Sequence, residues 1–269
     1  MISGVPTSIW LIGCGNMAGA MLQRWVESKA VDPAGVTVID PGQPKLPEGV
    51  RHVTSLPEDG TPQAVMIGVK PQMLDDIAGT LAPRIEGVKL LLSILAGVEV
   101  TSLAKRFEAE AIVRVMPNLP VALGHGAVGL HGADPDSDAG KMATALMDPL
   151  GTVEWIAEEK LFDAVTALSG SGPGFVYRFI DALAQAGAAL GLPKDQALRL
   201  ATATVEGSAM MAANADETPA ELADRVASKG GSTREGLNVL DRDEALEKLL
   251  VATLTAARDR NVELAAAAR

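Results

Sequence analysis

Short apolar runs alternate with helix-like segments over residues 1–158. The runs have the length of strands, are rich in Val and Ile, and are apolar on both faces, as is typical of strands buried in a parallel sheet. They are Ser8–Ile12, Val36–Ile39, Ala64–Val69, Lys89–Leu95 and Ala111–Met116, followed by Ala127–Leu130 and Thr152–Ile156. Between the runs, apolar residues recur with helical spacing in the segments Met17–Ser28, Pro71–Ala82, Val100–Phe107 and Ser137–Leu150. This alternation predicts right-handed β–α–β crossovers and an N-terminal Rossmann-type α/β domain over residues 1–158.

The pattern changes after Glu158. Residues 159–269 contain segments rich in Ala and Leu with helical spacing, separated by breaks that contain Gly or Pro. These segments are Leu161–Leu168, Phe175–Leu190, Lys194–Asn214, Pro219–Ala227, Thr233–Leu240 and Asp243–Ala268. They predict an all-α C-terminal domain. Because a small helical bundle cannot bury so many apolar side chains by itself, we expect an obligate homodimer formed through this domain.

Composition and charge narrow the class of protein. Hydrophobic residues make up 48% of the chain and aromatic residues only 3%, which predicts folded domains with aliphatic cores. The net charge of −11 argues against binding to nucleic acid. One cysteine and three histidines give no basis for a disulfide framework or a metal site. No apolar run reaches the roughly 20 residues of a membrane span and no signal peptide is recognisable, so we expect a cytoplasmic protein without a membrane partner.

The first strand leads into a dinucleotide-binding fingerprint. Gly13, Gly15 and Ala18 match the pattern G-x-G-x-x-G/A between a strand and a helix. Gly13 allows the tight turn, Gly15 lets the backbone approach a pyrophosphate, and Ala18 lets the helix pack closely on the strand. Asp40 ends the second strand, where a carboxylate can accept a hydrogen bond from the ribose 2′-OH. The motif predicts NADH or NADPH as cofactor, with Cys14 packing as a small side chain.

Two more loops follow strands at the edge where open α/β sheets bind ligands, namely Gly68–Gln72 and Leu95–Val98. Their small residues leave room for a nicotinamide ribose. Lys70 fits either a cofactor-lining position or a solvated position at the start of a helix.

The helical half offers a possible anion site but no strong acid. In the Gly-rich loop Ser228–Thr233, successive N–H groups can form a nest for a carboxylate, and Thr233 can cap the next helix; a simple interhelical turn is the alternative. This half has no histidine, and Tyr177 is the only tyrosine. A C=N substrate can arrive already protonated, so the missing acid favours an imine over a ketone.

At these residues the chain resembles the pyrroline-5-carboxylate reductase family, nearly from end to end. The motifs that carry the resemblance are GCGNMA at Gly13–Ala18, VKPQ at Val69–Gln72, LAGV at Leu95–Val98, RVMPNLP at Arg114–Pro120, ALSGSGPGF at Ala167–Phe175 and VASKGGSTREGL at Val226–Leu237. The resemblance implies reduction of 1-pyrroline-5-carboxylate to L-proline by NAD(P)H. It also implies a helical domain that intertwines with a partner subunit, and dimers that assemble further into a ring.

The resemblance assigns most of the candidate site residues, to which the end of the second strand adds Asp40 and the Gly-rich loop adds Lys229. Those expected to bind the cofactor are Gly13, Cys14, Gly15, Asn16, Met17, Val69, Lys70, Pro71, Ala96 and Gly97, together with Asp40. Those expected to bind the substrate are Lys229, Gly230, Gly231, Ser232, Thr233 and Asn118. Thr233, near the ring nitrogen, and Glu159, near the substrate, are the candidate catalytic residues. Because a threonine hydroxyl is a poor acid, we expect Thr233 to position the substrate rather than protonate it.

Two features depart from the family pattern. Lys229 stands where many relatives have proline, which adds a positive charge beside the expected carboxylate site. The stretch Asp40–Lys45 has no obvious clamp for a 2′-phosphate, although many relatives prefer NADPH. Since Asp40 would repel that phosphate, with Lys45 and Arg51 as the cations that could offset it, we expect NADH to be used at least as well as NADPH.

Two other functions fit the same organisation. A reductase of the β-hydroxyacid dehydrogenase type would need a catalytic lysine early in a long helix of the second domain, and Phe175–Leu190 contains none. A non-catalytic dinucleotide-binding sensor would leave the loop at Gly230–Thr233 without a substrate.

Overall fold

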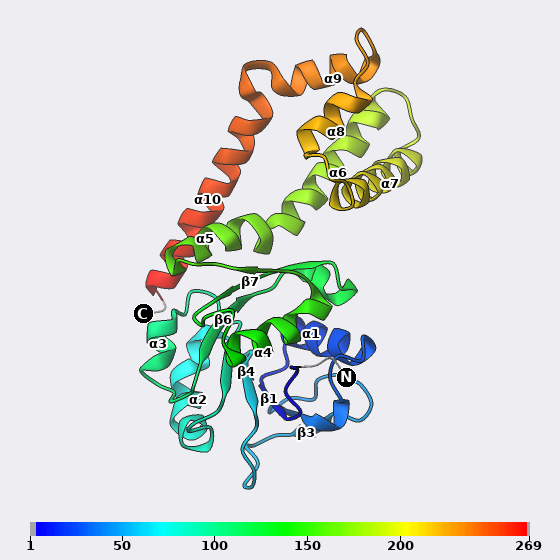
Figure 1. The fold of residues 1–269 in the computed structure, drawn as a ribbon. Helices are drawn as coiled ribbons and strands as arrows, with labels where there is room; N and C mark the ends of the chain where they lie inside the picture. Colours follow the sequence, from blue (N-terminus) through cyan, green and yellow to red (C-terminus); the bar gives the residue numbers. More distant parts are fainter. Residues whose placement is uncertain (1–3, 268–269) are drawn as a thin grey trace. The chain divides into compact units, whose positions relative to one another are not determined.

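The computed structural model describes residues 4–267 and divides the chain into two compact units (Figure 1). The first, the sheet unit, comprises Met1–Ser171 and Ala257–Arg269, and the second, the helical unit, comprises Gly172–Ala256. The domain boundary expected after residue 158 stays a prediction. The end of the helix expected at Ala268 lies outside the described residues.

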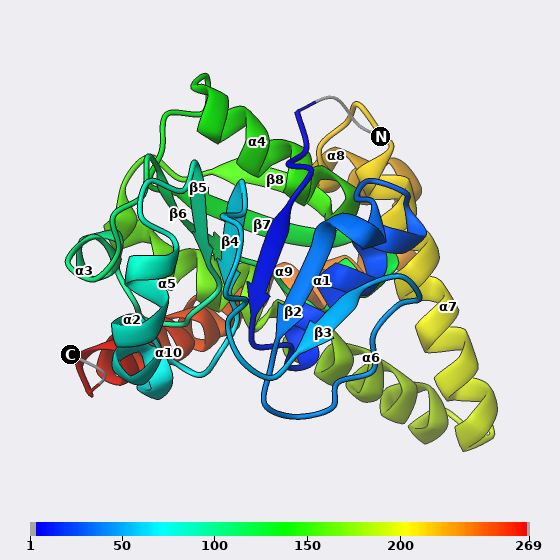
Figure 2. The same cartoon turned by 90° about the horizontal axis from the view of Figure 1, so that it is seen from below.

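The sheet unit is built on one sheet in the order β3-β2-β1-β4-β5-β6-β7-β8 (Figure 2). The strands are β1 (Ile9–Ile12), β2 (Val36–Ile39), β3 (Arg51–Val53), β4 (Ala64–Ile67), β5 (Leu90–Ser93), β6 (Ile112–Met116), β7 (Gly126–His131) and β8 (Gly151–Trp155). The first six in chain order are parallel, β7 is antiparallel to β6, and β8 is parallel to β7. This is the Rossmann strand order with two added strands, and it confirms the predicted fold class.

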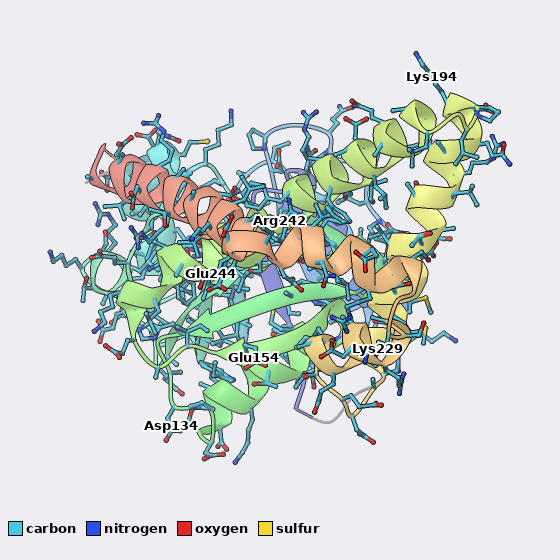
Figure 3. The ribbon with its side chains drawn as sticks, turned by 90° about the horizontal axis from the view of Figure 1, so that it is seen from above. Asp134, Glu154, Lys194, Lys229, Arg242 and Glu244 are labelled. Atoms are coloured by element: carbon cyan, nitrogen blue, oxygen red, sulfur yellow. The ribbon has the colours of Figure 1, made fainter. Side chains whose placement is uncertain are left out.

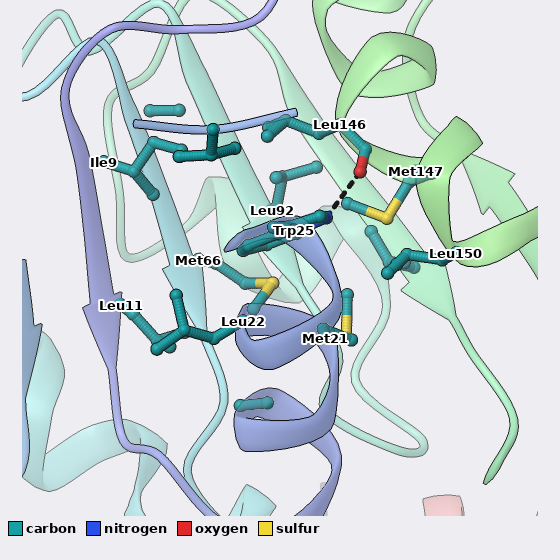
Figure 4. Close-up of a cluster of buried hydrophobic side chains, with 14 of the residues drawn as sticks. Ile9, Leu11, Met21, Leu22, Trp25, Met66, Leu92, Leu146, Met147 and Leu150 are labelled. Atoms are coloured by element: carbon teal, nitrogen blue, oxygen red, sulfur yellow. Dashed lines mark hydrogen bonds between the residues drawn. The ribbon is translucent and has the colours of Figure 1, made fainter. Parts of the chain in front are cut away.

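Helices on the two faces of this sheet enclose two cores. They are α1 (Asn16–Glu27), α2 (Leu74–Leu81), α3 (Val100–Ala104) and α4 (Asp138–Met147). The short helix α5 (Phe162–Val165) follows β8. Alternate residues of β1 serve both cores: Ile9 and Leu11 pack with α1 and α4, whereas Trp10 and Ile12 pack with α2 and α3. On the first face Trp25 is fully buried, and its indole N–H donates to the carbonyl of Leu146 at 2.6 Å (Figure 4).

Several predicted elements differ from the structure. The edge strand β3 was not predicted, because its three residues are partly exposed and lack a strong apolar pattern. The helix expected over Val100–Phe107 ends at Ala104. The helix expected from Asp243 begins at Ala245, because Asp243 and Glu244 have φ values of 54° and 57° and break the helical path.

The helical unit contains α6 (Gly172–Ala189), α7 (Lys194–Ala213), α8 (Pro219–Val226), α9 (Ser232–Asp241) and the first part of α10 (Ala245–Ala267). Helices α6 and α7 pack against each other. Apart from Pro173, the apolar side chains buried in this unit are alanines: Ala184, Ala197, Ala201 and Ala227. None of the helices described over residues 4–267 is long and apolar enough to cross a membrane.

The end of α10 returns to the sheet unit. There the side-chain amide of Asn261 donates a hydrogen bond to the carbonyl of Asp163, the second residue of α5, at 3.5 Å. The sheet unit is therefore assembled from two separate stretches of the chain.

Candidate functional site

A cleft of about 760 Å³ opens at the carboxyl ends of β1, β2 and β4. Since β2 and β4 lie on opposite sides of β1, the cleft is at the switch point of the sheet, where open α/β folds bind ligands. Of the residues predicted to bind the cofactor, those lining this cleft are Gly13, Cys14, Gly15, Asp40, Val69 and Lys70. The structure thus brings together residues from three separate loops.

The fingerprint turn has the geometry that its residues predict. Gly13 has a φ of +81°, and its N–H donates to the carbonyl of Ile39 at 2.8 Å. A Cβ at Gly13 would lie 2.7 Å from a methyl group of Val69, so any larger residue would clash. Gly15 is the N-cap of α1, has no cap from a side chain, and would place a Cβ in open space. The first N–H groups of α1, including those of Asn16 and Met17, therefore remain available to an anion.

Asp40 anchors this turn with its carboxylate. One oxygen accepts the N–H of Cys14 at 2.7 Å, and the other accepts the N–H of Gly42 at 2.7 Å. An ionised carboxylate has about four acceptor positions, so two remain for the hydroxyl groups of a ribose. Asp40 and Pro41 both line the cleft.

The sole cysteine is held in its neutral form by the same arrangement. Burial, and secondarily the negative charge of Asp40, raises the pKa of Cys14 from 9.0 to about 11. A protonated thiol is a poor nucleophile, which agrees with a packing role for Cys14. Within residues 4–267, no group of three or more His, Cys, Asp or Glu side chains could hold a metal ion.

The other two loops meet at a second cavity of about 410 Å³. Pro71, from the loop after β4, and Gly97, from the loop after β5, both line it. Ala96 lies exposed in the same loop as Gly97. Lys70 is exposed, precedes the turn Pro71–Met73 and borders the larger cleft, a position that fits both a cofactor-lining and a solvated lysine.

Glu159 has partners that the sequence did not reveal. Its Oε1 lies 2.7 Å from a guanidinium nitrogen of Arg114 and accepts the N–H of Val100 at 2.8 Å. Arg114 is 5% exposed, and its guanidinium carbon lies 4.5 Å from the ring centre of Phe162. The one available signal was a lone arginine in the apolar strand Ile112–Met116. The catalytic role expected of Glu159 stays a prediction.

Asn118 is buried, and its amide nitrogen and oxygen each make a hydrogen bond. It accepts the N–H of Ala127 at 2.9 Å and donates to the carbonyl of Ser169 at 3.0 Å. Ser169 lies in a π-helical turn, Thr166–Gly170. Because Pro173, four residues after Ser169, has no N–H, that carbonyl lacks its usual helical donor, and Asn118 supplies one. Substrate binding by Asn118 stays a prediction.

In the helical unit, the Gly-rich loop leads directly into α9. Gly230 has a φ of +73°, and Gly231 is the N-cap of α9, with no cap from a side chain. The expectation that Thr233 caps this helix is wrong, because Thr233 is the second residue of α9. Thr233 instead lies exposed in the first turn of α9, directly after Ser232, where the backbone N–H groups have no partner within the helix. Lys229 is exposed just before the loop's glycines (Figure 3).

Comparison with known proteins identifies the family. Residues 159–264 match the family described as pyrroline-5-carboxylate reductase dimerisation, and residues 8–97 match NADP oxidoreductase coenzyme F420-dependent. Pyrroline-5-carboxylate reductase of Glycine max is 36% identical over 93% of this chain and 94% of its own length. That of Pseudomonas aeruginosa is 34% identical over 96% of both chains. The solved structure of a pyrroline-5-carboxylate reductase from Coxiella burnetii has 30% identity and a TM-score of 0.86, covering 96% of this chain and 98% of that one. The chain therefore belongs to the pyrroline-5-carboxylate reductase family.

Proposed function

We propose that the protein reduces 1-pyrroline-5-carboxylate to L-proline with NAD(P)H, the last step of proline biosynthesis. One observation beyond family membership carries this proposal. Each unit has a Gly-rich loop that enters a helix through a glycine N-cap without a side-chain cap, at Gly15 and at Gly231. Such helix starts attract anions. The reaction needs two anion-binding sites, one for the pyrophosphate of the cofactor and one for the carboxylate of the substrate.

The fingerprint turn fits a dinucleotide. Its backbone can reach a pyrophosphate because no Cβ stands at Gly15, and the N–H groups of Asn16 and Met17 lie at the start of α1. Val69 and Lys70 line the same cleft, and Pro71 and Gly97 line the neighbouring cavity, where the nicotinamide end is expected. When bound, NAD(P)H supplies the hydride.

The loop Lys229–Thr233 is proposed to hold the substrate. The free N–H groups at the start of α9 bind the carboxylate, and the positive charge of Lys229 strengthens that binding. The hydroxyl of Thr233 orients the ring nitrogen for hydride transfer. Because a protonated imine already carries its proton, this loop needs to position the substrate more than to act as an acid.

We infer that NADH is used at least as well as NADPH. The charged side chains that line the larger cleft are Asp40 and Lys70, whereas Lys45 and Arg51 are not among its lining residues. At an effective dielectric constant of about 20, two like unit charges about 4 Å apart repel by about 4 kcal/mol before salt screening. Asp40→Ser should therefore raise the ratio of kcat/KM for NADPH to that for NADH, and an unchanged ratio would mean that Asp40 does not contact the ribose.

Assembly is proposed at two levels. The match to the dimerisation family and the exposed apolar side chains of the helical unit support a homodimer formed through that unit. A ring of such dimers, a cytoplasmic location and the domain boundary between residues 158 and 159 stay predictions. Analytical ultracentrifugation and cell fractionation test the first two.

The deciding experiment measures oxidation of NADH and of NADPH by the loss of their absorbance, with and without 1-pyrroline-5-carboxylate. We expect turnover that depends on the imine and yields proline. Binding of NAD(P)H without any turnover would indicate a dinucleotide sensor instead. Absence of both binding and turnover would remove the proposal altogether.

A further inference from the structure

The ion pair between the buried Arg114 and the partly buried Glu159 reaches the loop expected to line the nicotinamide. Arg114 lies on β6, directly opposite Ser93 at the end of the neighbouring strand β5. The loop Leu95–Val98 follows β5 and leads into α3. Glu159, from a distant part of the chain, accepts the N–H of Val100, the first residue of α3, at 2.8 Å. One carboxylate oxygen therefore links β6 to the far end of this loop.

This link replaces a local helix cap. Helix α3 has only five residues, and its N-cap, Glu99, makes no cap hydrogen bond with its side chain. A helix this short has little stability of its own, so an external acceptor on its first N–H helps to fix where it begins. The negative charge of Glu159 also suits the positive end of the helix.

Arg114 in turn fixes Glu159. Its guanidinium is buried against Phe162, and a buried cation without a partner is strongly destabilising. The distance of 2.7 Å between the two charged groups leaves the carboxylate little freedom to move. Gly97 lines the 410 Å³ cavity that Pro71 also lines, and a smaller cavity of about 280 Å³ beside Arg114 and Glu159. The loop thus borders both the cavity where the nicotinamide end is expected and the cavity beside the ion pair.

We propose that Glu159 is a positioning residue, which holds the loop Leu95–Val98 in the conformation that receives the nicotinamide end of the cofactor. This inference rests on the proposed function. In this proposal Glu159 supports binding of the cofactor, through its bond to Val100. If Glu159 instead contacted the imine directly, it would support binding of the substrate.

The test measures binding of NADH and NADPH to the full-length protein by fluorescence titration, and separately KM for the imine. For Glu159→Ala we expect the Kd of the cofactor to rise about tenfold, the scale of one lost charge-assisted hydrogen bond. Glu159→Gln keeps an acceptor oxygen for Val100 and should restore most of the affinity. Glu158→Gln is the matched control, because Glu158 is exposed and pairs only with the exposed Lys160 among the described ion pairs; its Kd should equal that of the wild type.

Two results would overturn the proposal. One is an unchanged Kd of the cofactor in Glu159→Ala together with a raised KM for the imine, which would place Glu159 at the substrate. The other is an equal loss of affinity in Glu159→Ala and Glu159→Gln. If Glu159→Ala fails to fold by circular dichroism, Glu159→Asp provides the comparison, because it keeps the charge while the shorter side chain draws the oxygen away from Val100. The Kd of the cofactor should rise in Glu159→Asp, and an unchanged Kd there would equally overturn the proposal. Failure of the wild type to bind NAD(P)H would instead contradict the proposed function itself.

Discussion

The two units of this protein bury apolar side chains in opposite ways. In the sheet unit, large residues are completely buried in two cores, with Trp25 and Met66 in one and Leu91 in the other. In the helical unit, alanines account for nearly all of the buried apolar side chains, while Phe179, Leu198 and other larger residues are exposed. The first unit has the interior of an independently stable domain, whereas the second has the surface of one half of an interface.

This contrast separates the sources of stability from the sources of function. The sheet unit can hold its cofactor loops rigidly because they end buried strands. The helical unit carries the proposed substrate loop on helices whose apolar faces need a second subunit. Four measurements can break or sharpen this division.

The largest effect is expected from a charge on the exposed apolar surface of the helical unit. Phe179→Asp should weaken the dimer by roughly 4–8 kcal/mol, because an aromatic anchor is lost and an unpaired charge is buried at the interface. Sedimentation should show a monomer without reductase activity. Gln196→Asp, at an exposed polar position of α7, is the control and should remain an active dimer. A dimeric and active Phe179→Asp variant would exclude this surface from the interface.

A cavity in the sheet unit should have the next largest effect. Trp25→Ala should lower the free energy of unfolding by about 3–5 kcal/mol, measured by urea titration and circular dichroism. Trp25→Phe, which keeps a ring but loses the bond to Leu146, should cost less. Both variants should sediment as dimers under native conditions; dissociation would mean that the two units do not stabilise the protein separately.

Thr233→Ala should affect only the substrate end of the reaction. Loss of a hydrogen bond to a charged group is worth roughly 1.5–3 kcal/mol, so kcat/KM for the imine should fall about 10- to 100-fold. The Kd of NAD(P)H should be unchanged, because Thr233 belongs to the helical unit and the fingerprint turn to the sheet unit. Thr233→Ser, which keeps the hydroxyl, should retain most of the activity. A parallel rise in the cofactor Kd would contradict the division of roles.

The smallest effect concerns the pH dependence of Cys14. Its pKa is raised in the folded protein from 9.0 to about 11, so the thiol keeps its proton after unfolded chains have lost theirs. The resulting stabilisation is fully present below pH 9 and is lost as the pH rises through about 11. Alkylation at pH 8 should be about 100-fold slower in the native than in the urea-unfolded protein, in proportion to the thiolate fraction. Equal alkylation rates in the native and the unfolded protein would show that burial and Asp40 do not keep the thiol of Cys14 protonated.

Local patterns were enough to predict the fold class, the fingerprint turn and most helices. The strands were recognisable because β1 and β4 are apolar on both faces, and Gly13 because a tight turn leaves no alternative residue. Helix starts were less predictable: Thr233 is a good N-cap residue, but the glycine two positions earlier takes that place.

Contacts between distant residues could not be predicted from one sequence. Arg114 and Glu159 are 45 positions apart, and Asn118 and Ser169 are 51 apart. Spacing along the chain says nothing about such pairs, since only the folded sheet brings β6 beside the segments that follow β8. The sequence therefore pointed to Glu159 as a candidate but not to the groups that hold it.

The return of α10 to the sheet unit has a consequence for the order of synthesis. Asn261 and Val262, which lie beside α5 and the small cavity at Glu159, are translated only after the whole helical unit. A ribosome-bound chain therefore carries an incomplete sheet unit while the exposed apolar helices emerge. Nascent chains of this protein should therefore stay bound to chaperones longest during that interval. Chaperone binding to ribosome-bound chains that end before residue 257 would test this.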